Sequence, residues 1–570
     1  MVPPSSAPSS HADYPWLKNY PAKVTWDGNI PVYPVSDMLD RTVRQYGDHP
    51  GFNFLGKKYS WSDLGDHVNR LAKGLQSIGV KKGVKVGLFL PNSPTFVISY
   101  FAVLKAGGTV VNFNPLYSVK ELKHQIEDSE TDIMITLDIK MLCDKMQEIL
   151  ETTRIKKLIV RKFTGLLPFP KNVLYPLLKG KDIAHLKPSD KIISYYDLTD
   201  NDATPAHVQI NPHEDIAVLQ YTGGTTGVPK GAMLTHANVV ANTEQAAQWL
   251  YDARPGEERM VGVLPFFHVF AMIAVMNLSV RYAMEIVALP RFELDQTLKL
   301  IDKYKPHYLP AVPAIYNAIS KNRNIAKYNL RSLRYCISGG APLPVEVKKE
   351  FEKLTGCVVV EGYGLTETSP VVSINPIDGE NKAGSIGMPL PGTIVEIINP
   401  EDKTTRMPVG ERGELCVRGP QVMKGYYNKP AETAEVLKDG LLYTGDVAVM
   451  DEKGFLYIVD RIKDLIITNG YNVYPRNVEE AIYLHPAVEE CIVAGIPDQA
   501  RGEIVKAWVK PREGQALSEG ELKNFLEDKV SKMEMPRAIE IRTQPLPKTM
   551  IGKLSRKDIL AEEKAKKTAA

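Results

Sequence analysis

Cysteine is scarce in this chain of 570 residues: five are present, and no two of them form a C-x-x-C pair. Disulfide frameworks and cysteine zinc sites need closely placed cysteines, so neither is indicated. This pattern favours a reducing, cytoplasmic location.

An excess of charge of either sign is also missing. The chain has 70 Lys and Arg residues against 67 Asp and Glu residues, a formal net charge of +3. Proteins that bind nucleic acid usually concentrate basic charge on one surface, so we expect no nucleic-acid partner. The N-terminus, MVPPSSAPSSHADYPW, has neither a basic segment nor an apolar core, and we therefore expect no signal peptide.

Only one apolar stretch, residues 261–280, has to be weighed as a membrane span. It contains Pro265, His268, Asn277 and Ser279, which are costly in hydrocarbon. We expect a buried helix entered by a Pro-containing loop, and a membrane span is the alternative.

The chain does contain a recurring alternation of β-rich runs and helical patterns. Residues 85–90 (KVGLFL) and 109–114 (TVVNFN) indicate strands on either side of a helix that ends at Gly107. The alternation recurs at 216–250 and at 333–364. It predicts an α/β fold with mostly parallel sheets that are covered by helices on both faces.

A chain of this length is too long for one compact core. Short strands separated by turn signals predict a β-rich subdomain at about 375–460, and the last hundred residues show an α+β pattern. We expect a large N-terminal domain over residues 1–462, made of two layered α/β subdomains and the β-rich one, and a small C-terminal domain over 463–570. The Lys-rich end of the chain is expected to fray.

The strongest local signal is YTGGTTGVPKG, residues 221–231, which follows an apolar strand. Its glycines let backbone N–H groups approach phosphate oxygens, its threonines add hydroxyls, and Lys230 adds a cation. It is not a Walker A loop, because Pro229 precedes the lysine and Gly231 follows it. The segment predicts a phosphate-binding loop of another kind.

Two further segments follow predicted strands. In EGYGLTE, residues 361–367, Tyr363 can stack on a nucleobase and Glu367 can hold Mg²⁺ against phosphate. A buried tyrosine beside a surface glutamate is the structural alternative. SGGAPLP, residues 338–344, is either a tight turn before a helix or a wall against adenine.

Three C-terminal segments are ambiguous one by one. In YTGD, residues 443–446, a carboxylate after a glycine turn suits the two hydroxyls of a ribose, or caps its own turn. DRIKDLIITNG, residues 460–470, lies at the predicted domain boundary, where charged residues are usually just solvated. Lys553, in LPKTMIGKLSR, is functional or an ordinary surface lysine.

Together, and in this order, the segments resemble the adenylate-forming superfamily of acyl-CoA synthetases, luciferases and peptide-synthetase adenylation domains. The likeness extends from about Trp16 to Arg556. Within the superfamily the chain looks most similar to bacterial long-chain fatty-acid–CoA ligases, through QYTGGTTGVPKGAMLTHANVVAN, EGYGLTETSPVVSINP, GPQVMKGYYNKP and NVYPRNVEE.

The resemblance implies that ATP activates a fatty acid as acyl-AMP and that the acyl group passes to coenzyme A, giving acyl-CoA, AMP and pyrophosphate. It implies that Lys553 neutralises charge during adenylation, that His268 lies beside the substrate carboxylate, and that the C-terminal domain is mobile and rotates about Lys463. Thr222 and Glu367 would hold Mg²⁺. The residues implied to contact ATP or CoA are Thr222, Gly223, Gly224, Thr225, Thr226, Gly227, Lys230, Gly339, Gly340, Ala341, Gly362, Tyr363, Gly364, Thr366, Asp446, Arg461 and Gly470.

An apolar acid is favoured as substrate, because FFHVF lacks the Asp that peptide-synthetase adenylation domains normally use for an amine. One alternative is a medium-chain or aryl acid–CoA ligase or another acyl-adenylating enzyme. The other is a non-catalytic acyl-binding or import scaffold, which would need none of the residues Lys230, Glu367, Asp446 and Lys553.

A basic and apolar segment covers residues 154–191. It contains ten Lys or Arg and only two acids, with Leu166, Leu167, Phe169, Leu174, Tyr175, Leu177 and Leu178 among them. The composition suits a weak peripheral contact with the inner face of the membrane, or an ordinary surface insertion. A homodimer is a further open expectation.

Overall fold

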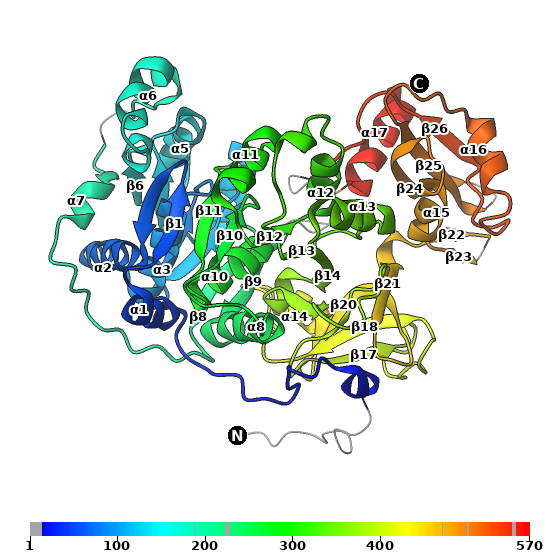
Figure 1. The fold of residues 1–570 in the computed structure, drawn as a ribbon, viewed down its shortest axis with the longest axis horizontal. Helices are drawn as coiled ribbons and strands as arrows, with labels where there is room; N and C mark the ends of the chain where they lie inside the picture. The colour runs from blue at the N-terminus through cyan, green and yellow to red at the C-terminus, as the bar shows by residue number, and fades with distance from the viewer. Residues whose placement is uncertain are drawn as a thin grey trace. The chain divides into compact units, whose positions relative to one another are not determined.

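The computed structural model describes residues 14–186, 189–222, 229–469, 471–498, 501–549 and 554–569. The chain divides into two compact units (Figure 1). The large unit comprises Tyr20–Ile394 and Arg418–Gly440. The small unit comprises the described parts of Met1–Asn19, Val395–Val417 and Leu441–Ala570.

The first sheet of the large unit has seven strands in the order β7-β6-β5-β3-β4-β8-β9. Their bounds are β7 (Ile192–Ser194), β6 (Lys157–Arg161), β5 (Ile133–Leu137), β3 (Lys85–Leu88), β4 (Thr109–Asn112), β8 (Ile216–Thr222) and β9 (Lys230–Thr235). All neighbours are parallel except β8 and β9. Every residue of β4 and β5 is buried, as expected for parallel strands covered on both faces.

The second sheet of the large unit has nine strands in the order β16-β15-β14-β13-β12-β10-β11-β1-β2. Their bounds are β16 (Met388–Pro389), β15 (Val371–Ile374), β14 (Val358–Gly364), β13 (Tyr335–Ser338), β12 (Tyr308–Ala311), β10 (Arg259–Gly262), β11 (Glu285–Ala288), β1 (Pro50–Phe54) and β2 (Lys57–Ser60). The strands from β14 to β1 are parallel, so their carboxyl ends share one edge. Ligands bind at such edges in α/β folds.

The helices of the large unit are α1 (Val35–Tyr46), α2 (Trp61–Ser77), α3 (Pro94–Lys105), α4 (Val119–Asp128), α5 (Lys140–Thr152), α6 (Lys171–Lys179), α7 (Tyr195–Thr199), α8 (His236–Trp249), α9 (Val269–Ala271), α10 (Leu278–Arg281), α11 (Leu294–Tyr304), α12 (Pro313–Ser320), α13 (Val345–Thr355) and α14 (Pro430–Val436). Helix α3 shows how the sequence defines them. Ser93 accepts the N–H of Phe96, and Pro94 occupies the first turn. Every residue from Pro94 to Leu104 is buried, as in a helix enclosed on all sides.

Shorter elements complete the large unit: η3 (Phe163–Leu166), η4 (Gly180–Asp182), the π-helical turn η5 (Met272–Asn277), η6 (Ile325–Lys327), η7 (Thr366–Thr368) and β19 (Leu437–Lys438). The expected buried helix in the apolar stretch 261–280 is confirmed: α9, η5 and α10 follow one another without a break, after the loop that contains Pro265. The strand β10 ends at Gly262, before this loop. No helix in the described ranges is long and apolar enough to span a membrane.

The small unit contains η2 (Pro15–Asn19) and the strands β17 (Ile394–Ile398), β18 (Gly413–Arg418), β20 (Leu441–Met450) and β21 (Leu456–Arg461). β18 pairs antiparallel with β20, and β20 with β21. After η8 (Ile462–Asp464) comes a second sheet, in the order β23-β22-β25-β24 with β26 beside β25. Its elements are β22 (Ile466–Thr468), β23 (Tyr471–Val473), β24 (Val488–Asp498), β25 (Gly502–Pro511), β26 (Ala538–Ile541), α15 (Pro475–Tyr483), α16 (Glu519–Leu526) and α17 (Arg556–Ala569).

The expected α/β class is confirmed, and so are the predicted strands and helices at 85–114. The prediction of a frayed tail was wrong, because α17 extends to Ala569. Ile559 is fully buried in the cluster that contains Trp508, and Glu563 forms a 2.8 Å ion pair with Lys506. These contacts hold a helix that composition alone does not indicate.

Candidate functional site

The predicted phosphate loop connects two antiparallel strands. Thr222 ends β8 and Lys230 begins β9, and the two residues are register partners. Gly223, Gly224, Thr225, Thr226 and Gly227 lie outside the described residues. The sequence predicted a helix over residues 236–250 after this loop, and α8 (His236–Trp249) confirms it. The strand β9, which lies between the loop and this helix, was not predicted. The lysine therefore lies on a hairpin, whereas a Walker A lysine lies at a helix start.

Glu367 lies beside the ends of this hairpin. It belongs to η7, which follows β14 and packs against β8 and β9. Its carboxylate Oε1 accepts a 2.7 Å hydrogen bond from the hydroxyl of Tyr426. The Nζ atom of Lys230 lies 4.9 Å from the centre of the same tyrosine ring. Burial, and then the adjacent Glu367, raise the pKa of Tyr426 well above its usual value, so its hydroxyl stays protonated and donates.

The residues predicted to surround adenine follow two neighbouring strands. The segment Gly339, Gly340 and Ala341 follows β13, and Gly362, Tyr363 and Gly364 end β14. β13 and β14 are parallel with Ser338 opposite Glu361, so both segments lie at the same sheet edge. A Cβ at Gly339 would lie 3.2 Å from the ring of Phe270, and one at Gly364 only 2.0 Å from the carbonyl oxygen of Pro370. Glycine is needed at Gly364 for this close approach.

His268 lies in the loop between β10 and α9. Asn92 anchors this loop: its Oδ1 accepts the N–H of Phe266 at 2.8 Å, and its amide donates to the Leu264 carbonyl at 2.8 Å. Gln220 of β8 donates to the Phe267 carbonyl at 2.9 Å. The Nδ1 atom of His268 accepts the N–H of Phe270, and burial lowers the pKa of the imidazole to about 4. His268 is therefore neutral near pH 7.

In the small unit, Asp446 of β20 lies opposite Arg461 of β21, with Nε and Oδ1 3.4 Å apart. The sequence placed Asp446 after a tight turn. Instead, YTGD lies inside the continuous strand β20, where the pairing with β18 is irregular and Gly445 has φ +74°. This bulge redirects the strand beside the carboxylate. Lys463 lies in η8 directly after β21, whereas Gly470 and Lys553 lie outside the described residues.

The carboxylate of Glu367 and the hydroxyl of Thr222 are oxygen ligands of the kind that a magnesium ion takes. The Oε1 atom of Glu367 is bonded to Tyr426, and Oε2 has no hydrogen-bond partner among the described residues. Within the same ranges, no group of three or more His, Cys, Asp and Glu side chains could hold a metal alone. Mg²⁺ commonly takes one or two carboxylates and completes its shell with phosphates and water.

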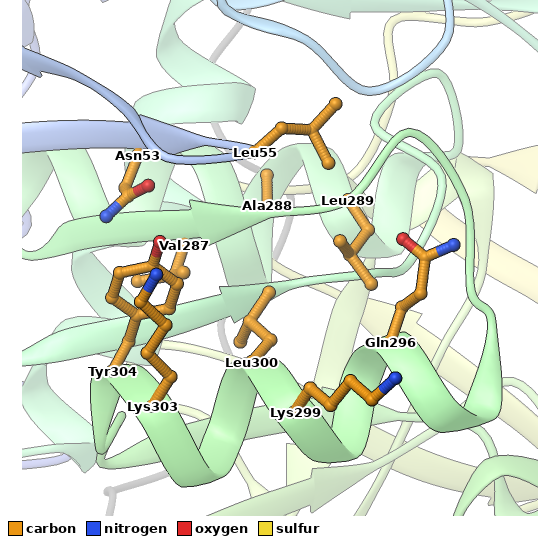
Figure 2. Close-up of a pocket in the computed structure, with 10 residues that line it drawn as sticks. All are labelled: Asn53, Leu55, Val287, Ala288, Leu289, Gln296, Lys299, Leu300, Lys303 and Tyr304. Carbon is orange, nitrogen blue, oxygen red and sulfur yellow. The ribbon is translucent and has the colours of Figure 1, made fainter. Parts of the chain in front are cut away.

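A groove elsewhere in the large unit contains none of the predicted site residues. Figure 2 shows its lining: Asn53, Leu55, Val287, Ala288, Leu289, Gln296, Lys299, Leu300, Lys303 and Tyr304. Leu300 of α11 faces the strand β11, and Lys299 lies along the rim. The candidate nucleotide site is therefore assigned from the strand ends, not from this groove.

Three side chains at the site were not predicted from the sequence. Asn92 and Gln220 lie in segments that we interpreted only as strand and loop, and nothing local distinguishes them. Tyr426 lies in GPQVMKGYYNKP, a segment that supported the resemblance but received no role. The resemblance of this segment to the family was a signal for Tyr426, but its hydrogen-bond partner Glu367 is 59 residues away in the chain, so the contact was not predicted.

The chain belongs to a family of nucleotide-using enzymes. Residues 39–427 match the family model described as AMP-binding enzyme, and residues 477–553 match the AMP-binding enzyme C-terminal domain. The predicted membership of the adenylate-forming superfamily is confirmed.

Among curated relatives, the chain is 45% identical to the long-chain-fatty-acid–CoA ligase of Bacillus subtilis over 96% of this chain and 98% of that one. Two solved structures are similar in fold to this chain. ATP-bound MatB from Rhodopseudomonas palustris has 27% identity and a TM-score of 0.80, covering 93% of this chain and 98% of that one. O-succinylbenzoate coenzyme A synthetase from Bacillus subtilis, in complex with ATP and magnesium ion, has 26% identity and a TM-score of 0.74, covering 91% and 98%.

Proposed function

We propose that this protein is an AMP-forming ligase that activates a long-chain fatty acid with ATP and transfers the acyl group to coenzyme A. The observation that carries the proposal is that η7, which contains Glu367 and follows β14, packs against β8 and β9 beside Lys230, while the adenine-side glycines follow the neighbouring strands β13 and β14. The full-length similarity to a long-chain-fatty-acid–CoA ligase supports the choice of reaction.

The chemistry needs two displacements. A carboxylate does not react with a thiol near neutral pH, because it carries negative charge and lacks a good leaving group. In the first step a carboxylate oxygen attacks the α-phosphorus of ATP and pyrophosphate leaves. In the second, the sulfur of coenzyme A attacks the carbonyl carbon, AMP leaves with the oxygen that joined it to the acyl group, and the thiol proton passes to the medium. The protein supplies position and electrostatics for both steps.

In this scheme the large unit holds the phosphates and the base. Thr222, residues 223–227 and Lys230 hold the phosphate chain, and Thr222 with Glu367 holds Mg²⁺. The ion would neutralise phosphate charge when it is bound. Tyr363 stacks on adenine against Gly339–Ala341, with Gly362, Gly364 and Thr366 around it. The neutral His268 can donate a hydrogen bond from Nε2 beside the substrate carboxylate.

The small unit completes the scheme. Asp446 accepts the ribose hydroxyls, with Arg461 beside it. We place the mobile domain at 463–570, after an N-terminal domain at 1–462, with Lys463 as the hinge. Lys553 serves adenylation, and the loop at Gly470 serves coenzyme A. The position of Lys463 in the exposed turn η8, between two separate sheets, supports the hinge.

Incorporation of ³²P-pyrophosphate into ATP, measured with each acid and without coenzyme A, tests the first step. We expect exchange that depends on a fatty acid and increases with chain length to a long-chain optimum. If exchange were fastest with medium-chain or aryl acids, the proposed adenylation would stand, but the substrate would be one of those acids and not a long-chain fatty acid. Acyl binding without any exchange would favour the scaffold alternative.

We further propose a peripheral membrane contact through α6. No residue of this helix is buried, and Figure 1 shows it at the margin of the large unit, beyond β6. Phe169, Leu177 and Leu178 expose 78–82% of their surface. Lysines at 171, 179 and 181 are exposed around them. Exposed apolar groups with basic neighbours suit the surface of an anionic bilayer, where fatty acids partition.

The apolar surface is smaller than the sequence suggested. Leu166 and Leu167 are buried inside the protein, and Tyr175 packs against Phe163 at 5.1 Å between ring centres. These contacts hold the base of α6, and leave its outer side for the membrane.

Co-sedimentation with anionic and neutral vesicles tests the contact. We expect weak binding to anionic vesicles that is lost when Phe169, Leu177 and Leu178 become Ser. Leu484→Ser provides a matched control, because this leucine is 67% exposed in the small unit. Unchanged binding of the triple variant would overturn the contact. Light scattering after gel filtration, in the same preparation, would test whether the protein forms the homodimer that the sequence analysis left open.

A further inference from the structure

Two adjacent tyrosines, Tyr426 and Tyr427, follow Gly425 in a segment that pairs with β9. The N–H of Met233 donates to the Gly425 carbonyl at 2.8 Å, and the N–H of Tyr427 donates to the Gly231 carbonyl at 2.8 Å. Ala232 and Tyr426 form an antiparallel bridge. The segment therefore pairs with the free edge of β9, the strand that begins at Lys230 in the β8–β9 hairpin.

The two tyrosine side chains make different contacts. The hydroxyl of Tyr426 donates to Glu367 at 2.7 Å, and its ring lies beside the ammonium group of Lys230. The hydroxyl of Tyr427 lies 2.5 Å from Glu130 and accepts a hydrogen bond from Lys85 at 2.7 Å. Among the described residues, the side chain of Tyr426 contacts Glu367 and Lys230, whereas that of Tyr427 contacts Glu130 and Lys85.

The surroundings hold Tyr426 firmly. Its side chain is buried at 8% exposure, and its N–H donates to Thr433 Oγ1 at 2.9 Å. The preceding chain is fixed by Asn238 of α8, whose amide donates to the carbonyls of Pro420 and Val422. A further backbone bond, from Met423 N–H to the Glu367 carbonyl at 2.8 Å, ties the segment to η7. The tyrosine thus has a fixed position from which to orient Glu367.

We infer that Tyr426 is a positioning residue for magnesium–ATP: its hydroxyl holds Glu367 Oε1, which would leave Oε2 to bind a magnesium ion, and its ring restrains the ammonium of Lys230. A hydrogen bond from the neighbouring shell fixes the orientation of a metal-binding carboxylate, and its loss usually weakens metal affinity or activity 10- to 100-fold. A lysine over an aromatic face is attracted by the ring and loses freedom of movement. This inference rests on the proposed roles of Glu367 and Lys230.

The two contacts can be separated by substitution. Tyr426→Phe removes the hydroxyl but keeps the ring beside Lys230, whereas Tyr426→Leu removes both. Tyr427→Phe removes the neighbouring hydroxyl, which bonds to Glu130 and Lys85, and is the matched control. ATP binding is measured by isothermal titration calorimetry without fatty acid, once with Mg²⁺ and once with EDTA, so turnover plays no part in the reading.

We expect wild type and Tyr427→Phe to bind ATP more tightly with Mg²⁺ than with EDTA. Tyr426→Phe should lose about 10- to 100-fold in affinity with Mg²⁺ and match wild type in EDTA, which also shows that it is folded. Tyr426→Leu should weaken binding in EDTA as well. If Tyr426→Phe bound magnesium–ATP as tightly as wild type, this inference would be wrong, while the proposed metal role of Glu367 would stand. A wild-type protein whose ATP affinity ignores Mg²⁺ would overturn the metal role of Glu367 and, with it, this inference.

Discussion

The guanidinium of Arg556 lies 3.1 Å from the carboxylate of Asp464, the residue that follows Lys463. The same group lies 3.4 Å from Asp460, which precedes the proposed hinge, and 2.8 Å from Glu479 of α15. Burial alone would lower the pKa of Arg556, but the three carboxylates raise it above its usual value. Burial raises the pKa of Asp460 and of Glu479, and the arginine opposes this shift. One cation therefore compensates acids on both sides of the hinge.

Replacing Arg556 with Met should lower the free energy of unfolding of the small unit by about 3 kcal/mol or more, because it leaves largely buried carboxylates unpaired. Arg406→Met is the control, since Arg406 pairs with Glu396 while its side chain is 59% exposed, and such pairs contribute about 1 kcal/mol at most. Urea unfolding at neutral pH measures both. Equal, small losses would contradict a structural role for the Arg556 cluster.

Lys553→Ala should reduce acyl-adenylate formation by about 100-fold or more, because a preorganised cation opposite developing negative charge is lost. The variant should still form thioester from supplied acyl-AMP and coenzyme A. Pyrophosphate exchange and single-turnover thioester formation separate the two steps. Similar losses in both would remove Lys553 from its proposed role.

Lys463→Pro should have the opposite effect. Proline fixes one backbone dihedral and so restricts rotation at the hinge, without touching the nucleotide contacts. We expect adenylation to survive and thioester formation to fail, in the same pair of assays. Normal overall turnover in this variant would show that the hinge is not at Lys463.

Asp446→Ala should raise the KM for ATP about 10- to 100-fold, because a carboxylate that accepts the ribose hydroxyls is lost. With 2′-deoxy-ATP the loss should be smaller, since one of these hydrogen bonds is already missing. Initial rates with the two nucleotides, for wild type and variant, give the comparison. An equal loss on both would show that Asp446 does not contact the 2′-hydroxyl.

Stability should fall on mild acidification, in part because of His236. This residue is 1% exposed, its Nδ1 accepts the N–H of Val35 at 3.1 Å, and burial lowers its pKa from 6.5 to about 4. Below pH 6.5 the imidazole of His236 binds a proton in the unfolded chain, but in the folded protein it stays neutral down to about pH 4. Its contribution to the free energy of unfolding is therefore fully present above pH 6.5 and is lost as the pH falls towards 4.

The difference amounts to about 2 kcal/mol between pH 7 and pH 5. His236→Asn keeps an acceptor for Val35 and removes the titration, so it should lose about that much less than wild type over this range. His213→Asn, at an exposed position, is the control. Urea unfolding at the two pH values decides, and identical pH dependence in wild type and His236→Asn would contradict the assignment.

Much of the large unit could be predicted from periodicity. Residues 109–112 and 217–221 are continuous buried runs within β4 and β8, which pair in parallel. The sequence did not predict β9 between the phosphate loop and α8. The segment KGAMLT is short, and we interpreted it as part of the loop that leads into the helix. In residues 261–280 the sequence predicted the buried helical run of α9, η5 and α10 and the loop before it. It did not predict the π-helical geometry of η5, since an apolar pattern does not distinguish this turn from an α-helix.

The residues of the candidate site were proposed from sequence motifs, but the contacts between them were not. Tyr363, Glu367 and Lys230 were identified because their motifs occur together, which a resemblance can detect. The hydrogen bond from Tyr426 to Glu367, and the anchoring of the His268 loop by Asn92, join residues far apart in the chain. Such pairs form only when the sheets assemble, so no local pattern contains them. Leu166 and Leu167 likewise appeared available to a membrane until their burial was known.

The central claim is that an acyl-adenylate links the two steps, and isotope transfer tests it most directly. The protein is given ATP, Mg²⁺, coenzyme A and palmitate with ¹⁸O in both carboxylate positions, and the products are analysed by mass spectrometry. The account predicts one ¹⁸O atom in each AMP and one in each acyl-CoA, with AMP and thioester in equal amounts. Unlabelled AMP, ADP in place of AMP, or no product with palmitate or any other acid would contradict it.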